Sequence, residues 1–368
     1  MTAIHQFLPS FAGRDAVGMQ CLRTRDLLRG AGYASEIVAG AVASEVRGEA
    51  YTLDRFTEEV LPRNDREDTV ALYHFSIGSP FLDRVTDLGL PVGIYYHNIT
   101  DAHHFLRWNP AVASELLAGR RQLSQLAGSA AFAIAASHFS EAELRSLGFA
   151  HTEVVPLLVD FADYAAPADS AVVRARTNTR HAGGEWLFVG RIAPNKCQHD
   201  VIAGFAAYRA VYDRDARLTF VGGRTSDTYA RALEGTCEHL GVTDAVTFAD
   251  LVSQSALLAY YKTSDVFVSA SEHEGFGVPL LEAMHFDVPV VAYASSAVPE
   301  TVGEGGLLLA DKDPMTLATA VHEVMQDEPL RKELVAAGRE RVESLSADRI
   351  GPVMLETLRR VAGPTAAG

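Results

Sequence analysis

Short apolar runs alternate along the chain with longer stretches in which apolar residues recur at helical spacing. We predict strands at 4–8, 35–40, 71–78, 92–100, 131–137 and 152–158, and again at 186–190, 218–223, 245–250, 266–270, 288–294 and 306–310. Helical stretches such as 22–32 and 111–126 separate several of these runs. Nearly continuous apolar strands between helices are typical of parallel sheets that helices cover on both faces. Because the series occurs twice, we predict an α/β fold of two doubly wound parallel-sheet, Rossmann-like domains.

A polar segment at 160–185 interrupts this pattern near the middle of the chain. It shows little apolar periodicity and ends in a glycine pair directly before a predicted strand, as expected of a linker. We therefore predict an amino-terminal domain over 1–163, a carboxyl-terminal domain over 164–345, and a helix over 346–368 that crosses back towards the amino-terminal domain. A break is predicted at 351–352, a glycine followed by proline, because proline costs a helix one hydrogen bond.

Charge and cysteine usage narrow the possible partners. Of the 368 residues, 47 are acidic and 32 basic, for a formal charge of −15, which argues against nucleic acid or an anionic membrane as the main partner. Cys21, Cys197 and Cys237 have no paired spacing and fit a reducing, cytoplasmic location. We expect neither a secretory signal nor an integral membrane segment. The oligomeric state stays open.

The segment SASEHEGFGVPLLEAM at 269–284 has the most informative chemical pattern. Glu274 and Glu282 flank a glycine turn at 275–277, which follows a predicted strand and precedes a helix with Pro279 in its first turn. Glycines let a ligand approach the backbone, and the unpaired N–H groups of a helix start attract phosphate. Carboxylates can accept hydrogen bonds from hydroxyls. The segment therefore favours a sugar nucleotide over the alternative, a structural corner with solvated glutamates.

A second loop, within 187–202, carries Arg191 and Lys196 with no acidic residue between them. Both follow a predicted strand, where an arginine fork and a lysine point charge can clamp a diphosphate. A surface loop with two solvated cations is the alternative interpretation.

The amino-terminal half offers less specific candidates. Gly13, Asp15 and Gly18 follow the first predicted strand without forming a G-x-G-x-x-G pattern, so a plain tight turn is an equal alternative. His97 follows a strongly apolar strand and should emerge at its carboxyl end, where it can orient a hydroxyl or transfer a proton. Gly13, Asp15 and Asn98 are our candidates for contact with an acceptor.

We predict no metal site. His103 and His104 are adjacent, so we expect their side chains to point apart, and no H-E-x-x-H motif occurs. Asp311 and Asp313 form the nearest approach to a D-x-D motif, but they follow a late, short predicted strand.

Taken together, these segments resemble the retaining GT-B glycosyltransferases, specifically glycosyltransferase family 4 (group 1). The similar stretches are FVGRIAPNK, LTFVGG, AVTFADLVSQSALLAYYKTSDVFVSASEHEGFGVPLLEAM and VPVVAYASSAVPETVGEGG, in the family's order over 186–310. The amino-terminal half is similar only in layout and in DAVG. One departure is Asp287, where the family usually has glycine, and we expect it to alter a turn without abolishing donor binding. The resemblance implies two domains that face each other across a cleft.

The resemblance also implies roles for the candidate residues. Arg191 and Lys196 would neutralise a leaving diphosphate, and Glu274 would hold a hydroxyl of the transferred sugar. His97 would lie beside the reacting face of that sugar, and Glu282 would receive the ribose hydroxyls. The implied donor-binding set further includes Gly18, Gly190, Leu251, Val252, Gly275, Phe276, Gly277 and Val278, with Leu251 and Val252 near the base and Gly18 against the diphosphate or the acceptor.

The activity that the resemblance implies is transfer of a sugar, with retention of configuration and without a metal or other cofactor. The donor would be a nucleoside-diphosphate sugar, and the acceptor a hydroxyl of a saccharide or a small molecule such as an aminocyclitol. The negative charge would suit a cationic acceptor, a growing polysaccharide is equally admissible, and UDP is favoured over GDP only by frequency. The alternatives are an epimerase, a hydrolase or a phosphorolytic enzyme on the same fold, and a two-domain sugar-binding protein without catalysis.

Overall fold

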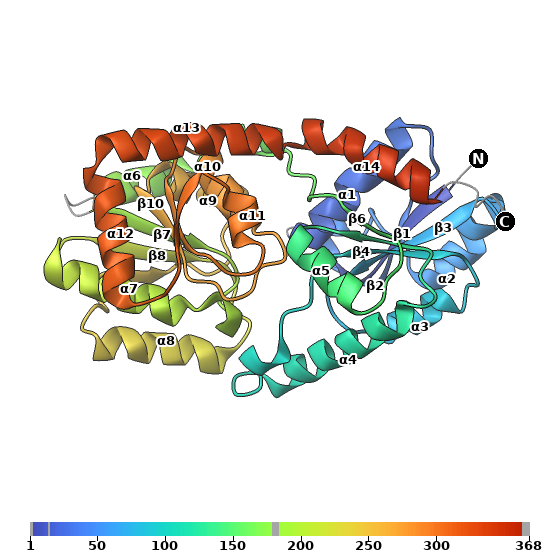
Figure 1. The fold of residues 1–368 in the computed structure, drawn as a ribbon, viewed down its shortest axis with the longest axis horizontal. Helices are drawn as coiled ribbons and strands as arrows, with labels where there is room; N and C mark the ends of the chain where they lie inside the picture. Colours follow the sequence, from blue (N-terminus) through green and yellow to red (C-terminus); the bar gives the residue numbers. More distant parts are fainter. Residues whose placement is uncertain (1–2, 14, 179–183, 363–368) are drawn as a thin grey trace. The chain divides into compact units, whose positions relative to one another are not determined.

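The computed structural model describes residues 3–13, 15–178 and 184–362. The chain divides into two compact units (Figure 1). Unit 1 comprises 1–102, 111–160 and 345–368, and unit 2 comprises 103–110 and 161–344. The predicted amino-terminal domain over 1–163 includes the segment 103–110, which belongs to unit 2 in the structure. Among the described residues, no helix is long and apolar enough to cross a bilayer.

Unit 1 is built on a six-stranded sheet in the order β2-β1-β3-β4-β5-β6, and all neighbouring strands are parallel. The strands are β1 (Ala3–Phe11), β2 (Ile37–Val42), β3 (Thr69–Phe75), β4 (Val92–Tyr96), β5 (Phe132–Ala135) and β6 (Thr152–Val154). The α-helices that belong mainly to unit 1 are α1 (Ala16–Gly30), α2 (Leu53–Arg55), α3 (Phe81–Thr86), α4 (Pro110–Leu126), α5 (His138–Ser146) and α14 (Ala347–Ala362). Strand β3 is buried along its whole length, as expected of a strand with helices on both faces.

Unit 2 has a second six-stranded parallel sheet, in the order β12-β11-β10-β7-β8-β9. Its strands are β7 (Glu185–Val189), β8 (Arg217–Val221), β9 (Val246–Phe248), β10 (Val266–Ser269), β11 (Val290–Tyr293) and β12 (Gly306–Leu309). Its α-helices are α6 (Ser170–Asn178), α7 (Gln198–Val211), α8 (Asp227–His239), α9 (Gln254–Lys262), α10 (Val278–His285), α11 (Val298–Val302), α12 (Pro314–Gln326) and α13 (Glu328–Ser344). Short helical turns occur in both units, and they are η1 (Ser44–Val46), η2 (Phe56–Val60), η3 (Leu61–Arg63), η4 (Ala102–His104), η5 (Phe161–Tyr164) and η6 (Pro194–Lys196).

Every predicted strand is present, so the prediction of an α/β fold with two doubly wound parallel sheets is confirmed. The strand predicted at 92–100 is shorter in the structure, where it ends as β4 at Tyr96. Two residues later Asn98 has a left-handed backbone with φ of 74°. This conformation lies outside the extended region of backbone angles and turns the chain away from the sheet.

The last helix, α14, belongs to unit 1 and packs there against α1, which confirms the predicted return. The predicted helix break at 351–352 is wrong, because Pro352 lies inside α14 and the chain leaves helical structure at 345–346. Pro352 itself is exposed. The buried side chains of Met354 and Leu358 anchor the opposite face, so packing outweighs the hydrogen bond that the proline removes.

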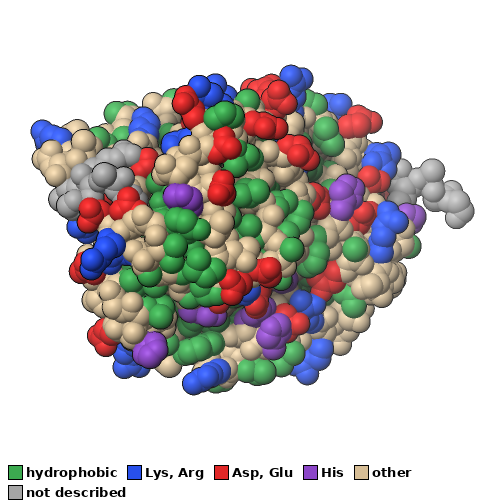
Figure 2. Space-filling view, turned by 60° about the vertical axis from the view of Figure 1, so that its left-hand side comes forward, with side chains coloured by type: hydrophobic (Ala, Val, Ile, Leu, Met, Phe, Trp, Pro, Cys, Tyr) green, Lys and Arg blue, Asp and Glu red, His purple; other side chains and the backbone are tan. Residues whose placement is uncertain are grey.

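The core of unit 2 lies between its sheet and the helices α7, α8 and α12. Trp186 at the start of β7 is fully buried and meets the rings of Phe205 and Tyr208 edge to face. All three cysteines of the chain are buried and free. On the surface, acidic and basic side chains are interspersed over the face seen in Figure 2, which suits a protein whose formal charge is −15.

Candidate active site

The strand order of unit 2 reverses between β7 and β10. Strands β7, β8 and β9 follow one another in one direction, and β10, β11 and β12 in the other. In open parallel sheets, ligands bind at the carboxyl ends of the two strands that flank such a reversal. The loops that leave these strands span 190–197 and 270–277, and they are joined directly, because the Glu272 N–H donates a 2.9 Å hydrogen bond to the Asn195 carbonyl.

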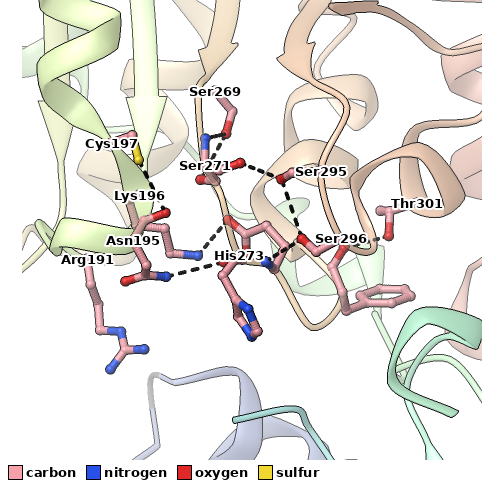
Figure 3. Close-up of polar contacts among 12 residues, drawn as sticks. Arg191, Asn195, Lys196, Cys197, Ser269, Ser271, His273, Ser295, Ser296 and Thr301 are labelled. Carbon is pink, nitrogen blue, oxygen red and sulfur yellow. Dashed lines mark hydrogen bonds and ion pairs between the residues drawn. The ribbon is translucent and has the colours of Figure 1, made fainter. Parts of the chain in front are cut away.

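These two loops bring Lys196 and Glu274 together. The Lys196 ammonium donates to Glu274 Oε1 over 2.5 Å, and each side chain keeps only 14% of its surface exposed (Figure 3). The two residues are 78 positions apart in sequence. A partly desolvated ion pair has stronger electrostatics than one in bulk water, so a ligand at this point meets a fixed cation and a fixed anion.

Residues that the sequence reasoning missed hold the Glu274 loop in place. The Ser296 hydroxyl accepts a 2.8 Å hydrogen bond from the Glu274 N–H, and Ser295 donates to the Ser271 carbonyl over 2.5 Å. Thr301 donates to the Phe276 carbonyl over 2.5 Å (Figure 3). The only signal in the sequence is the serine pair at 295–296 after a predicted strand, which does not by itself identify its partners.

Helix α10 begins directly after this loop. Gly277 caps it with φ of 98°, and a Cβ there would lie 2.8 Å from Leu280 Cδ1, so glycine is required. Pro279 occupies the first turn, as predicted. Within the part of the chain that the structure describes, no acceptor bonds the N–H groups of Phe276 and Gly277. The turn therefore presents backbone donors and the positive end of a helix dipole beside Lys196.

Glu282 lies one turn further along α10, apart from the Lys196–Glu274 pair. Its two oxygens accept hydrogen bonds of 2.5 Å from the hydroxyls of Tyr164 and Tyr261, and the residue is only 8% exposed. Burial, followed by the nearby Glu282 charge, raises the pKa of Tyr261, so that this phenol stays protonated and donating. Neither tyrosine was among our candidates.

Four further donor candidates lie at the same edge of the sheet but make no contact with the ion pair. Arg191 is exposed, and its side chain extends away from Lys196 (Figure 3). Leu251 is 73% exposed in the loop after β9, next to the half-buried Val252. Gly190 has φ of 150°, and its carbonyl lies 2.1 Å from the position of a Cβ on Gly222, so the two loops cross very closely.

In unit 1, the glycine loop after β1 has a structural explanation. Asp15 caps α1 by accepting a 2.7 Å hydrogen bond from the Gly18 N–H. A Cβ on Gly18 would lie 1.9 Å from the Ala12 carbonyl oxygen, and one on Gly13 would lie 2.5 Å from Val46 Cγ1. Close packing of the loop therefore accounts for both glycines without a ligand.

His97 follows β4, as predicted, and belongs to a chain of buried polar groups. His74 Nδ1 lies 2.9 Å from His97 Nε2, and His74 Nε2 lies 2.9 Å from Gln6 Oε1. Burial, together with the neighbouring His74, lowers the pKa of His97. Asn98 is buried and donates to Ser140 Oγ over 3.0 Å, so this acceptor candidate serves the turn that ends β4.

Among the described residues, two groups of side chains have the composition of a metal site, and one of them is Cys197, His199 and Asp200. His103, His104 and Glu272 have ligand atoms within 4.8 Å of one another on the wall of a cavity of about 330 Å³. The expectation that the two histidines point apart is wrong, because their ring centres lie 3.9 Å apart, with the rings tilted by 35°. Lys312 already neutralises Glu272, with Nζ 2.5 Å from Oε1, and Asp313 caps α12. Because Lys312 neutralises the Glu272 carboxylate, the electrostatic attraction of this group for a further cation is weak.

Solved structures with the same architecture include the sucrose-phosphate synthase of Thermosynechococcus elongatus, which is 20% identical, with a TM-score of 0.74 over 98% of this chain and 99% of that chain. Anabaena Alr3699/HepE in complex with UDP and glucose is 17% identical, with a TM-score of 0.76 over 97% and 100% of the two chains. The likeness shows that the chain has the GT-B fold.

Residues 172–341 match the family described as glycosyl transferases group 1. Over this region, the chain is similar to the group 1 glycosyl transferases. Among curated proteins, the D-inositol 3-phosphate glycosyltransferase of Geodermatophilus obscurus is 35% identical over 198 residues, which are 52% of this chain and 43% of that protein. The chain thus spans about half the length of the curated relatives that it matches.

Proposed function

We propose that the protein is a retaining glycosyltransferase that moves a sugar from a nucleoside-diphosphate sugar to a hydroxyl of an acceptor. The observation that carries this proposal is the Lys196–Glu274 pair, which lies at the strand-order reversal of unit 2. It stands beside the unpaired N–H groups at the start of α10. A cation and backbone donors suit a diphosphate, and a carboxylate suits a sugar hydroxyl.

In the reaction, the bond between the anomeric carbon and the diphosphate oxygen breaks, and a bond to the acceptor oxygen forms. Negative charge collects on the diphosphate, and the acceptor hydroxyl releases its proton, which a diphosphate oxygen can take. Lys196 and the N–H groups of Phe276 and Gly277 are fixed before the reaction, so they stabilise this charge without reorganising. Glu274 accepts a hydrogen bond from the transferred sugar, and Arg191 adds a second cation once its exposed side chain turns to the diphosphate.

We assign binding of the nucleoside end of the donor to Glu282 and to the loop after β9. A carboxylate has about four acceptor sites, so Glu282 can accept hydrogen bonds from ribose hydroxyls while Tyr164 and Tyr261 hold it. The exposed Leu251 and neighbouring Val252 offer an apolar surface to the base. His97 is assigned to the reacting face of the sugar.

A hydroxyl-rich ring, either a saccharide or a cyclitol, is the acceptor class that we propose. The curated relatives named D-inositol 3-phosphate glycosyltransferase act on a cyclitol phosphate by name. Two statements stay predictions from the sequence and the resemblance. They are that the protein needs no metal or other cofactor, and that it works in the cytoplasm.

A thermal-shift screen with nucleotides and nucleotide sugars tests the donor. A ligand at 100 times its Kd should stabilise the folded protein by about 2.7 kcal/mol, and the ranking of UDP, GDP and their sugars identifies base and sugar together. No shift with any nucleotide sugar, but a shift with free sugars, would instead support the non-catalytic sugar-binding protein.

Product analysis separates the enzyme alternatives. With the donor from the screen and a panel of saccharides and cyclitols, we expect a glycoside whose anomeric configuration, read by NMR, is that of the donor. Consumption of the donor at the same rate without any acceptor would support a hydrolase or an epimerase, and an inverted product would contradict retention.

A further inference from the structure

A continuous line of buried hydrogen bonds crosses the sheet of unit 1 and ends at His97. The Gln6 amide nitrogen, on β1, donates to the Cys21 carbonyl over 2.9 Å. Gln6 Oε1 lies 2.9 Å from His74 Nε2 on β3, and His74 Nδ1 lies 2.9 Å from His97 Nε2. Gln6 and His74 have no exposed surface, so water cannot reach either of these two side chains.

The direction of each hydrogen bond follows from its neighbour. A backbone carbonyl can only accept, so the Gln6 amide nitrogen must face Cys21 and its oxygen must face His74. His74 Nε2 therefore carries a proton. A neutral imidazole has one N–H and one acceptor nitrogen, so His74 Nδ1 is an acceptor, and the proton between the two histidines belongs to His97 Nε2.

The remaining nitrogen of His97 then has a defined role. With its proton on Nε2, neutral His97 has a lone pair on Nδ1. Over residues 3–13, 15–178 and 184–362, no protein group hydrogen-bonds to this nitrogen. His97 is half-buried rather than fully enclosed. Contacts of its ring with the rings of Tyr95 and His74, at 4.7 and 5.2 Å between ring centres, limit its rotation.

We propose that Gln6 and His74 are positioning residues that fix His97 as a hydrogen-bond acceptor through Nδ1, so that the ligand group it meets is a hydroxyl donor. This inference rests on the proposed function for the identity of the ligand, but not for the protonation pattern. The hydroxyl belongs either to the transferred sugar or to the acceptor, since both ligands offer the same chemistry.

The test is NMR of the protein labelled with ¹⁵N in its histidine rings, with His97 assigned from the spectrum of His97→Gln. We expect the wild type to show His97 Nε2 protonated and Nδ1 unprotonated, with a coupling across the hydrogen bond between His97 Nε2 and His74 Nδ1. A proton on His97 Nδ1, or on His74 Nδ1, would overturn the proposal whatever the activity of the protein.

Two variants and a matched control sharpen this result. His74→Phe keeps the ring but removes the acceptor, and Gln6→Met removes the oxygen that orients His74. In each, the protected Nε2 proton of His97 should exchange at least about tenfold faster, because a hydrogen bond of about 1.4 kcal/mol is lost. Tyr73→Phe alters the neighbouring buried residue on β3 and should leave the His97 resonances unchanged. If one variant fails to fold, the wild-type spectrum and the other variant still test the proposed protonation of His97.

Ligand titrations identify the hydroxyl. The His97 Nδ1 resonance should move when the nucleoside-diphosphate sugar binds alone, if the hydroxyl is on the sugar, or only when the acceptor is added to the nucleoside-diphosphate complex, if it is on the acceptor. Movement in neither titration, with both ligands bound, would overturn the acceptor role. His74→Phe should also lower kcat/KM by about tenfold. If the wild type transfers no sugar, the proposed function is refuted. The NMR spectra still test the protonation pattern independently of that result.

Discussion

The two sheets of this protein have the same number of strands and place different kinds of polar groups at their strand-order reversals. In unit 2, the reversal between β7 and β10 holds the charged pair of Lys196 and Glu274. In unit 1, the order reverses between β1 and β3, and neutral groups cross it, from Gln6 on β1 to His74 on β3 and on to His97. The strand orders differ as well, since unit 2 has the 3-2-1-4-5-6 arrangement and unit 1 begins 2-1-3.

The difference shows how one architecture can support two kinds of recognition. A fixed cation is useful where a reaction gathers negative charge, so the charged pair of unit 2 fits a leaving diphosphate. A neutral, directional line of hydrogen bonds carries no net charge but defines which atom donates and which accepts. The line in unit 1 therefore fits recognition of a hydroxyl.

The largest effect should come from the charged pair. We expect Lys196→Ala to reduce kcat by about 10²–10³, as for loss of one donor to a developing oxyanion. Glu274→Gln keeps the shape of the side chain and should lose most transfer through its contact with the sugar. Lys332→Ala, which breaks an exposed pair with Glu328, is the control and should transfer at the parental rate. Either active-site variant transferring sugar at the parental rate would contradict the assignment.

Buried tyrosines give a matched comparison of stability between the units. Tyr261→Phe removes a donor to the buried Glu282 carboxylate and should lower the free energy of unfolding by about 1.5–3 kcal/mol. Tyr73→Phe in unit 1 removes a buried hydroxyl that has no hydrogen-bond partner among the described residues. It should be neutral or stabilising. Urea unfolding of both variants measures the difference, and an equal loss in both would show that Glu282 gains nothing from Tyr261.

The neutral histidines of unit 1 predict a dependence of stability on pH. Burial, and to a smaller extent the charge of Arg29, lowers the pKa of His5 to about 4, and burial lowers that of His74 to about 3. The unfolded chain binds these protons near pH 6.5 but the folded chain does not. Stability is therefore full above pH 6.5 and falls as the pH drops towards 4.

The slope should be at most about 1.4 kcal/mol per pH unit for each such histidine. Unfolding curves between pH 7.5 and 4.5 test this expectation, and His74→Phe should show a shallower fall than the wild type. A wild-type stability that stays constant down to pH 4.5 would mean that these histidines are not held neutral.

The smallest effect is expected at Asp287, which belongs to neither polar region. Its φ of 58° is a conformation that glycine adopts without strain, and its carboxylate forms two hydrogen bonds of 2.7 Å with Arg339. Asp287→Gly relieves the strain and removes the exposed pair, so the melting temperature should change little and donor binding should be unchanged. A loss of donor binding would show that this departure from the family pattern matters.

Sequence patterns predicted the strands well because each is a nearly continuous apolar run. They did not predict the strand order, because a run does not specify its neighbour, and the two units differ in this respect. The position of Pro352 was misjudged for a similar reason. Proline signals a helix end locally, whereas the buried face of α14 decides the outcome through tertiary packing.

The candidate site was predictable to the extent that it lies within one segment. Glu274, Gly277 and Pro279 occupy a single strand-loop-helix corner, and its pattern was visible. The residues that hydrogen-bond to that corner could not be predicted, because Ser296 and Tyr164 reach it from other parts of the chain. The line from Gln6 to His97 was missed for the same reason, since a glutamine in a strand gives no sign of the histidine beside it.

Isothermal titration with the nucleoside diphosphate selected by the thermal-shift screen tests the central claim most directly. We predict that the wild type binds it in unit 2 and that Lys196→Ala binds it at least about tenfold more weakly, because a charge-assisted hydrogen bond of about 1.5–3 kcal/mol is lost. Equal binding by the wild type and Lys196→Ala, with both proteins folded, would place the nucleotide away from the reversal between β7 and β10 and contradict the account.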